Sequence, residues 1–194
     1  MTLNIERDTI LWTQFRNGDE ASFVTLFRNY YSGLFQYGCK ISKDSSLVED
    51  CIQELFIEMW RTNGKAEIIS LRAYLFKAFK FKLVRAVNKI GKTSKLMADQ
   101  DIEIFQLSHE IFLMNEQENK ILIQKVQNAL EQLSPRQKEI VYLKFYMDLS
   151  YEEVSEIMNI NYQASRNLVY QAVKVLKNIL AAQIILSLFA ISFY

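Results

Sequence analysis

Hydrophobic residues recur at helical spacing through most of the first ninety residues. One broad apolar stripe runs from Phe23 to Phe35 with its members three and four residues apart, which is the pattern of a helix packed into a core. A second helix is expected over residues 47–60, with its inward face formed by Val48, Cys51, Ile52, Leu55, Phe56 and Met59. Ser70 is a suitable N-cap for a third helix over residues 71–90. The apolar positions of this third helix, from Leu71 to Ile90, predict its buried edge and leave its basic residues on the rest of the circumference.

The last third of the chain contains two helix-start signals and a tight turn. SPRQ at residues 134–137 has serine at the cap, proline in the first turn and glutamine at the third position, and SYEE at residues 150–153 repeats the capping-box spacing. NIN at residues 159–161 predicts a turn whose last asparagine caps a third helix, from residue 162 to about residue 180. A short helix, a tight turn and a longer helix form a helix-turn-helix unit.

The composition favours an all-α fold, and its near-neutral net charge conceals segments of opposite charge. Five glycines and one proline among 194 residues, half of them hydrophobic, leave too few turns for a sandwich or barrel. The formal net charge is only +1, from 23 Lys and Arg against 22 Asp and Glu. However, residues 72–95 carry eight bases and no acid, residues 99–118 carry six acids and no base, and no acid follows Glu156. A local basic segment can bind nucleic-acid phosphates even when the whole protein is near neutral.

The third helix of the helix-turn-helix unit is expected to enter the major groove of DNA by its N-terminal end. Gln and Asn pair with adenine and Arg with guanine, so its outward residues suit base contacts. The residues expected to bind DNA there are Tyr162, Gln163, Arg166, Asn167, Tyr170 and Lys174, and Gln171 also faces outward. A plain three-helix bundle is the alternative, and the absence of acids from this helix favours DNA binding.

These segments resemble the sigma-70-type initiation factors of bacterial RNA polymerase. Residues 133–180, which begin LSPRQ and contain YEEV, resemble region 4 of that family, and the first ninety residues resemble region 2. The pattern of Asp50, Gln53, Glu54 and Phe56 resembles the family's polymerase-binding helix. Because no region 3 domain lies between the two, the chain is most similar to the extracytoplasmic-function group of these two-domain factors.

The resemblance implies a role for each matching segment. Asp50, Gln53, Glu54 and Phe56 would bind the clamp helices of the polymerase β′ subunit, and the helix around residues 139–145 would lie against the β flap. The loop over residues 61–69 would capture a flipped base of the promoter −10 strand by stacking and edge hydrogen bonds, and the recognition helix would read the −35 element. The residues implied in −10 DNA binding are Arg61, Asn63, Lys65, Arg72, Tyr74, Lys77, Lys80, Arg85 and Lys89. The expected partners are core RNA polymerase and promoter DNA, with an anti-sigma factor as a further candidate.

Four domains or segments are expected along the chain. Residues 1–92 form the region 2-like domain, residues 93–119 an acidic linker, residues 120–180 the region 4-like domain, and residues 181–194 an apolar tail. As a helix, residues 179–194 would be about 24 Å long, short of the ~30 Å hydrocarbon core of a bilayer. Packing on this chain or on a partner is therefore favoured over contact with a membrane surface. We hypothesise that the tail covers a promoter- or polymerase-binding face of the free protein.

No catalytic site, metal site or cofactor is expected. The single histidine, His109, falls in the linker, and GKT at residues 91–93 lacks the earlier glycine of a phosphate loop because Ala86 stands there. Cys39 and Cys51 are too few for a disulfide framework, and the N-terminus does not resemble a secretory signal. The sequence therefore predicts a cytoplasmic, non-enzymatic protein without a small-molecule substrate. The alternative function is a free-standing helix-turn-helix regulator, which gives no role to the acidic face of residues 50–54.

Overall fold

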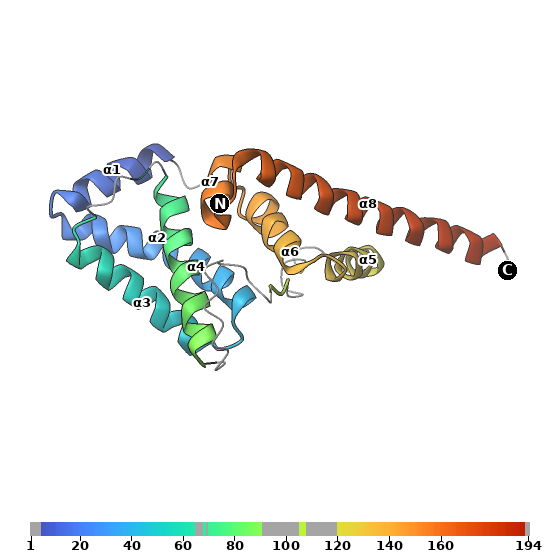
Figure 1. Cartoon of the computed structure of the whole chain (residues 1–194), viewed down its shortest axis with the longest axis horizontal. Helices are drawn as coiled ribbons and strands as arrows, with labels where there is room; N and C mark the ends of the chain where they lie inside the picture. Colours follow the sequence, from blue (N-terminus) through green and yellow to red (C-terminus); the bar gives the residue numbers. More distant parts are fainter. Residues whose placement is uncertain (1–4, 65–67, 69, 91–104, 108–119, 193–194) are drawn as a thin grey trace.

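Helices joined by turns and loops make up the part of the chain that the computed structural model describes, which is residues 5–64, 68, 70–90, 105–107 and 120–192. Figure 1 shows an N-terminal bundle and a C-terminal group of helices packed together, with the last helix extending away from the bundle. The bundle contains α1 (Ile5–Arg16), α2 (Glu20–Ile41), α3 (Ser45–Arg61) and α4 (Leu71–Ile90). The C-terminal group contains α5 (Lys120–Glu131), α6 (Pro135–Val141), the π-helical turn η3 (Tyr142–Tyr146), α7 (Tyr151–Met158) and α8 (Tyr162–Ser192). The predicted all-α fold class is confirmed for these residues.

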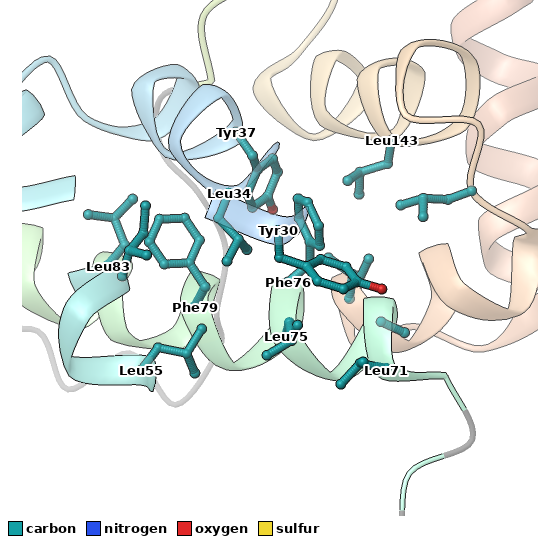
Figure 2. Close-up of a cluster of buried hydrophobic side chains, with 14 of the residues drawn as sticks. Tyr30, Leu34, Tyr37, Leu55, Leu71, Leu75, Phe76, Phe79, Leu83 and Leu143 are labelled. Carbon is teal, nitrogen blue, oxygen red and sulfur yellow. The ribbon is translucent and has the colours of Figure 1, made fainter. Parts of the chain in front are cut away.

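Helices α2 and α3 begin at capped ends and pack along the faces that the sequence predicts. The carboxylates of Asp19 and Asp44 accept hydrogen bonds from the backbone N–H groups of Ser22 and Leu47, which satisfies free donors at each helix start. The apolar residues predicted to face inward on α3 are all buried: Val48, Cys51, Ile52, Leu55, Phe56 and Met59. Figure 2 shows the core that these helices share with α4, where Leu34, Leu55 and Phe79 lie close together.

Helices α2, α3 and α4 lie close together at Gly38. A Cβ atom at this position would lie 2.6 Å from Cγ1 of Val48 and 2.8 Å from Cζ of Phe79. Carbon atoms attract best at about 3.5 to 4 Å, so any side chain here would push the neighbouring helices apart. Glycine is therefore required for this crossing.

Helix α1 is an element that the sequence analysis does not predict. It packs on α2 and α4 and buries Trp12 and Phe15. The buried carboxylate of Asp8 accepts a hydrogen bond of 2.6 Å from the Tyr30 hydroxyl. Because α1 has few apolar residues and an acid among its buried positions, its sequence lacks a clear amphipathic stripe.

The helix-turn-helix unit forms as predicted. The capping boxes at Ser134 and Ser150 are both present, and Asn159 ends α7 in the left-handed conformation, with φ of 52°. The side chain of Asn161 accepts a 2.7 Å hydrogen bond from the Ala164 N–H at the start of α8. However, the helix that was expected to end near residue 180 continues to Ser192, because residues 181–192 contain neither glycine nor proline to stop it. Described side chains end at Ala181, so the docking of the apolar tail stays a prediction.

One continuous core joins the bundle to the C-terminal group. It includes Leu71, Leu75 and Phe76 of α4 together with Leu143 of η3 and Val154 of α7, and Figure 2 shows Leu143 facing the α2–α4 core. Part of the expected linker joins this core, because residues 105–107 are described and Phe105 is buried. The rest of the linker, including His109, lies outside the described residues, and so does the GKT sequence at its start.

Candidate functional site

The N-terminal half of α8 presents a polar and aromatic face to solvent. Tyr162 and Tyr170 are 44% and 67% exposed, the Gln163 amide donates a 3.2 Å hydrogen bond to Asn167, and the Arg166 guanidinium lies 5.9 Å from the Tyr162 ring centroid. The remaining residues predicted on this face, Gln171 and Lys174, are exposed as well. The predicted outward face is therefore present at the surface, and its contact with DNA stays a prediction.

Helix α7 packs against α8 beneath this face. Val169 and Ala172 are buried on the opposite side of α8. Ser165 is fully buried, where its hydroxyl lies 3.1 Å from the Ser155 hydroxyl and donates to the Tyr162 carbonyl. A small residue at this crossing lets the two helices approach closely, as a recognition helix and its supporting helix do.

Helix α3 carries an acidic face beside an apolar groove. Asp50, Gln53 and Glu54 are exposed, whereas Phe56, predicted with them as a polymerase contact, is only 3% exposed. A groove of about 550 Å³ runs between α2 and α3, and Phe56 lines it with Glu20, Phe23, Val24, Phe27, Gln53, Ile57, Trp60 and Arg61. Phe56 therefore belongs to the groove wall, and the sequence analysis missed the exposed Val24, Ile57 and Trp60 around it.

The basic residues of α4 do not all reach solvent. Arg85 and Lys89 are exposed, and Tyr74 and Lys77 are partly buried. Lys80, in contrast, is only 3% exposed, so the prediction that the basic residues occupy the free circumference of this helix is wrong for Lys80. The physical reason is that the C-terminal group covers a second face of α4, through α7 and through Glu139 of α6, which lies on Lys80. In the preceding loop Arg61 and Asn63 are exposed, and Lys65 lies outside the described residues.

Arg72 is also covered, by a carboxylate of α7. Its Nε and Nη2 donate to the two carboxylate oxygens of Glu153 at 3.1 and 2.7 Å, and the Ser70 hydroxyl donates to Glu153 at 2.8 Å. Burial raises the pKa of Glu153, but hydrogen bonds from Arg72, the Ser150 N–H and Ser70 outweigh it, and the pKa lies below its ordinary value. Glu153 is thus an ionised partner of Arg72 as well as a capping residue.

A second buried carboxylate neutralises Lys80. The Lys80 Nζ atom lies 2.9 Å from Glu139 Oε1, and these side chains are 3% and 2% exposed. The Tyr37 hydroxyl donates to the same carboxylate, and burial together with the charge of Glu139 raises the pKa of Tyr37 well above its ordinary value. Glu139 belongs to the helix expected at the β flap, and its buried ion pair is not predicted, although it is three and four residues before the apolar Tyr142 and Leu143 and therefore shares their helix face.

Among the described residues, no group of three His, Cys, Asp or Glu side chains is arranged to hold a metal ion. Within the same part of the chain, no helix combines the length and the apolar character that crossing a bilayer requires.

Comparison with known proteins gives matches to sigma factors along most of the chain. The family model described as Sigma-70, region 4, matches residues 123–176. The ECF RNA polymerase sigma factor SigK of Mycobacterium sp. (strain JLS) is 22% identical over 178 residues, covering 88% of this chain and 89% of SigK. SigM of Bacillus subtilis (strain 168) is 22% identical over 153 residues, covering 78% of this chain and 91% of SigM.

Two solved structures share the fold. CnrH, solved in complex with the cytosolic domain of CnrY, has a TM-score of 0.60 and 18% identity, with 91% of this chain and 98% of that chain covered. RpoE from Bartonella quintana, solved with the anti-sigma factor NepR, has a TM-score of 0.54 and 20% identity, with 82% and 96% covered. Residues 123–176 thus match sigma-70 region 4, most of the chain is similar in sequence to ECF sigma factors, and the fold is the one that CnrH and RpoE share.

Proposed function

We propose that the chain binds core RNA polymerase and directs it to promoters, with the bundle acting at the −10 element and the α7–α8 unit at the −35 element. The observation that carries this proposal is the presence of two unlike exposed faces on one chain. One is the acidic face of α3 beside its apolar groove, and the other is the acid-free face of α8. A free-standing regulator needs only the second face.

The polymerase contact is assigned to α3. Asp50, Gln53 and Glu54 would meet basic side chains of the β′ clamp helices, and the groove between α2 and α3 would accept an apolar side chain from the same partner. Ile57 and Val24 are 49% and 43% exposed at this groove, which is the pattern of apolar anchors with a charged rim that protein interfaces use. Phe56 would act as part of the groove wall.

The DNA contacts are assigned to the cations and aromatic residues at the surface of α4 and α8. Arg61, Asn63, Lys77, Arg85 and Lys89 would contact the −10 strand, together with Lys65, which lies outside the described residues. The outward residues of α8 would read the −35 element, where Gln163, Arg166 and Asn167 have side chains suited to base edges. Arg72 and Lys80 would contact the −10 DNA only when the carboxylates of Glu153 and Glu139, which bind them here, move away.

An anti-sigma factor is the further partner that we propose. RpoE was solved with the anti-sigma factor NepR and CnrH with the cytosolic domain of CnrY, and this chain shares their fold. The cytoplasm, where core polymerase and promoter DNA are found, is the proposed location, and the proposed role is non-enzymatic.

The test measures binding of the purified chain to core RNA polymerase. The double charge reversal Asp50→Lys and Glu54→Lys should abolish binding, because it turns the acidic face basic. The double reversal Glu6→Lys and Glu131→Lys, at exposed positions of α1 and α5, makes the same change in net charge and should leave binding intact. Polymerase binding by the Asp50 and Glu54 variant would contradict the assigned interface, and duplex binding without polymerase would favour the regulator.

A further inference from the structure

Two carboxylates of the C-terminal group lie on two cations of α4. Glu153 of α7 binds Arg72 through both oxygens, and Glu139 of α6 binds Lys80, with all four side chains at most 12% exposed. The partners are 81 and 59 residues apart in sequence. Each pair therefore joins the C-terminal group to the N-terminal bundle.

The geometry at Arg72 is that of oxyanion recognition. A guanidinium offers a planar fork of donors that matches either a carboxylate or a phosphate. Here Glu153 fills that fork, and the Ser70 hydroxyl donates to the same carboxylate. A further Arg72 contact is a 3.3 Å hydrogen bond to the Asp148 carbonyl, so α7 and the loop before it supply these acceptors.

An aromatic cluster lies at the same contact between the N-terminal bundle and the C-terminal group, which we call the seam. Phe105 is 2% exposed, and its ring centroid lies 5.9 Å from that of Tyr37 in α2 and 5.7 Å from that of Tyr142 in η3. The next residue, Gln106, donates its backbone N–H to the Lys40 carbonyl at 2.8 Å. A short linker segment thus packs between the two groups of helices, so the contact uses three separate parts of the chain.

The seam contains one feature that favours its opening. The Tyr142 hydroxyl is buried, and no hydrogen-bond partner for it exists among the described residues. A buried hydroxyl without a partner is destabilising, since water would bind it in the open form. The closed arrangement is therefore held by ion pairs and apolar packing but opposed by this group.

We infer that the packing of α6 and α7 on α4 is an autoinhibitory contact, in which Glu139 and Glu153 occupy the cations that otherwise hold promoter phosphates. This inference rests on the proposed function, because it takes Arg72 and Lys80 as DNA contacts. Buried ion pairs often stabilise a fold less than apolar residues of similar size would. A pair whose cation can exchange a carboxylate for a phosphate suits a switch between two states.

The test uses the full chain with Glu153→Gln. A glutamine side chain still accepts the Ser150 N–H, so the capping box remains while the charge on Arg72 is lost. The matched control is Glu152→Gln, the exposed neighbour on the same helix. Glu153→Gln, but not Glu152→Gln, should have a larger radius of gyration in small-angle X-ray scattering than the native chain. It should also associate with core polymerase at least about tenfold faster, because removing one partner of a buried ion pair strongly destabilises the contact.

Two further variants keep the inference open to refutation. Phe105→Ala removes a ring that packs between the two helix groups and changes no residue of either group, so it should open the chain even if Glu153→Gln folds poorly. Tyr142→Phe removes the unpaired hydroxyl and should act in the opposite direction, with tighter packing and slower association.

The outcomes separate this inference from the proposed function. Unchanged scattering and unchanged association in Glu153→Gln and Phe105→Ala would overturn the autoinhibitory contact. An opened chain that associates no faster would overturn the inhibition while leaving polymerase binding in place. Failure of every variant and of the native chain to bind polymerase would instead overturn the proposed function and the inhibition with it.

Discussion

At the residue scale, the surroundings of a charged side chain determine what it can bind. Arg85 and Lys80 lie on the same helix, yet Arg85 is exposed and Lys80 is buried against Glu139. Only the first can meet a phosphate without a change in structure. Glu153 is the clearest case, because one carboxylate caps its own helix and also neutralises a cation of another.

The lowered pKa of Glu153 predicts an acid-sensitive contribution to stability. Its pKa in the folded protein lies below the ordinary 4.5, so the ionised side chain stabilises the fold above that pH. This contribution is lost as the pH falls below 4.5 and through the folded-state pKa. The free energies of unfolding of the native chain and of Glu153→Gln, measured by urea denaturation, should therefore converge as the pH is lowered. A difference that stays constant from neutral pH into this range would contradict the assignment.

A glycine pair within α2 gives a second prediction. Gly38→Ala should destabilise the fold by about 1–3 kcal/mol, because its Cβ would meet Val48 and Phe79 in a packed core. Gly33→Ala is the control in the same helix, since the nearest atom to its Cβ is 3.5 Å away, and alanine favours helix formation by roughly 1 kcal/mol. Urea denaturation of both variants measures this. Equal destabilisation at the two positions would argue against the close crossing at Gly38.

At the element scale, features that depend on residues close together in sequence could be predicted, and contacts between distant segments could not. The capping boxes at Ser134 and Ser150 and the inward face of α3 depend on residues a few positions apart, which a sequence displays directly. The π-helical turn η3 could not be predicted, because its extra residue per turn leaves no mark in the apolar spacing. The pairing of Arg72 with Glu153 crosses 81 residues and follows only from how the helices pack.

The exposed face of α8 predicts sequence-specific effects on transcription. Arg166→Ala and Gln163→Ala should each lower initiation from promoters that use the −35 element, because a good side-chain contact to a base contributes about 1–3 kcal/mol of discrimination. Lys177→Ala, at an exposed position more than three turns from the start of α8, should have a smaller effect that is uniform across promoters. Transcript yields from several promoters would measure the difference. Equal losses at every promoter for Arg166→Ala would contradict base reading.

At the scale of the whole molecule, the two halves share their main core, and a smaller buried cluster of Leu130, Leu133 and Ala172 joins α5 to α8. Residues from α2, α4, η3 and α7 belong to the main core. The sequence predicts two halves joined by an acidic linker. It does not predict that the halves pack together or that Phe105 of the linker is buried between them. The closed arrangement follows from side chains that are far apart in sequence and matched in charge.

Transcription in vitro tests most directly whether the chain directs core RNA polymerase to promoters. Core polymerase transcribes genomic DNA with and without the purified chain, and the transcript 5′ ends are sequenced. If the chain has this function, we expect new, discrete start sites that share two upstream motifs at a constant spacing, one for the bundle and one for α8. They should be lost in the Asp50→Lys and Glu54→Lys variant. No new start sites, or start sites that this variant leaves unchanged, would contradict this function.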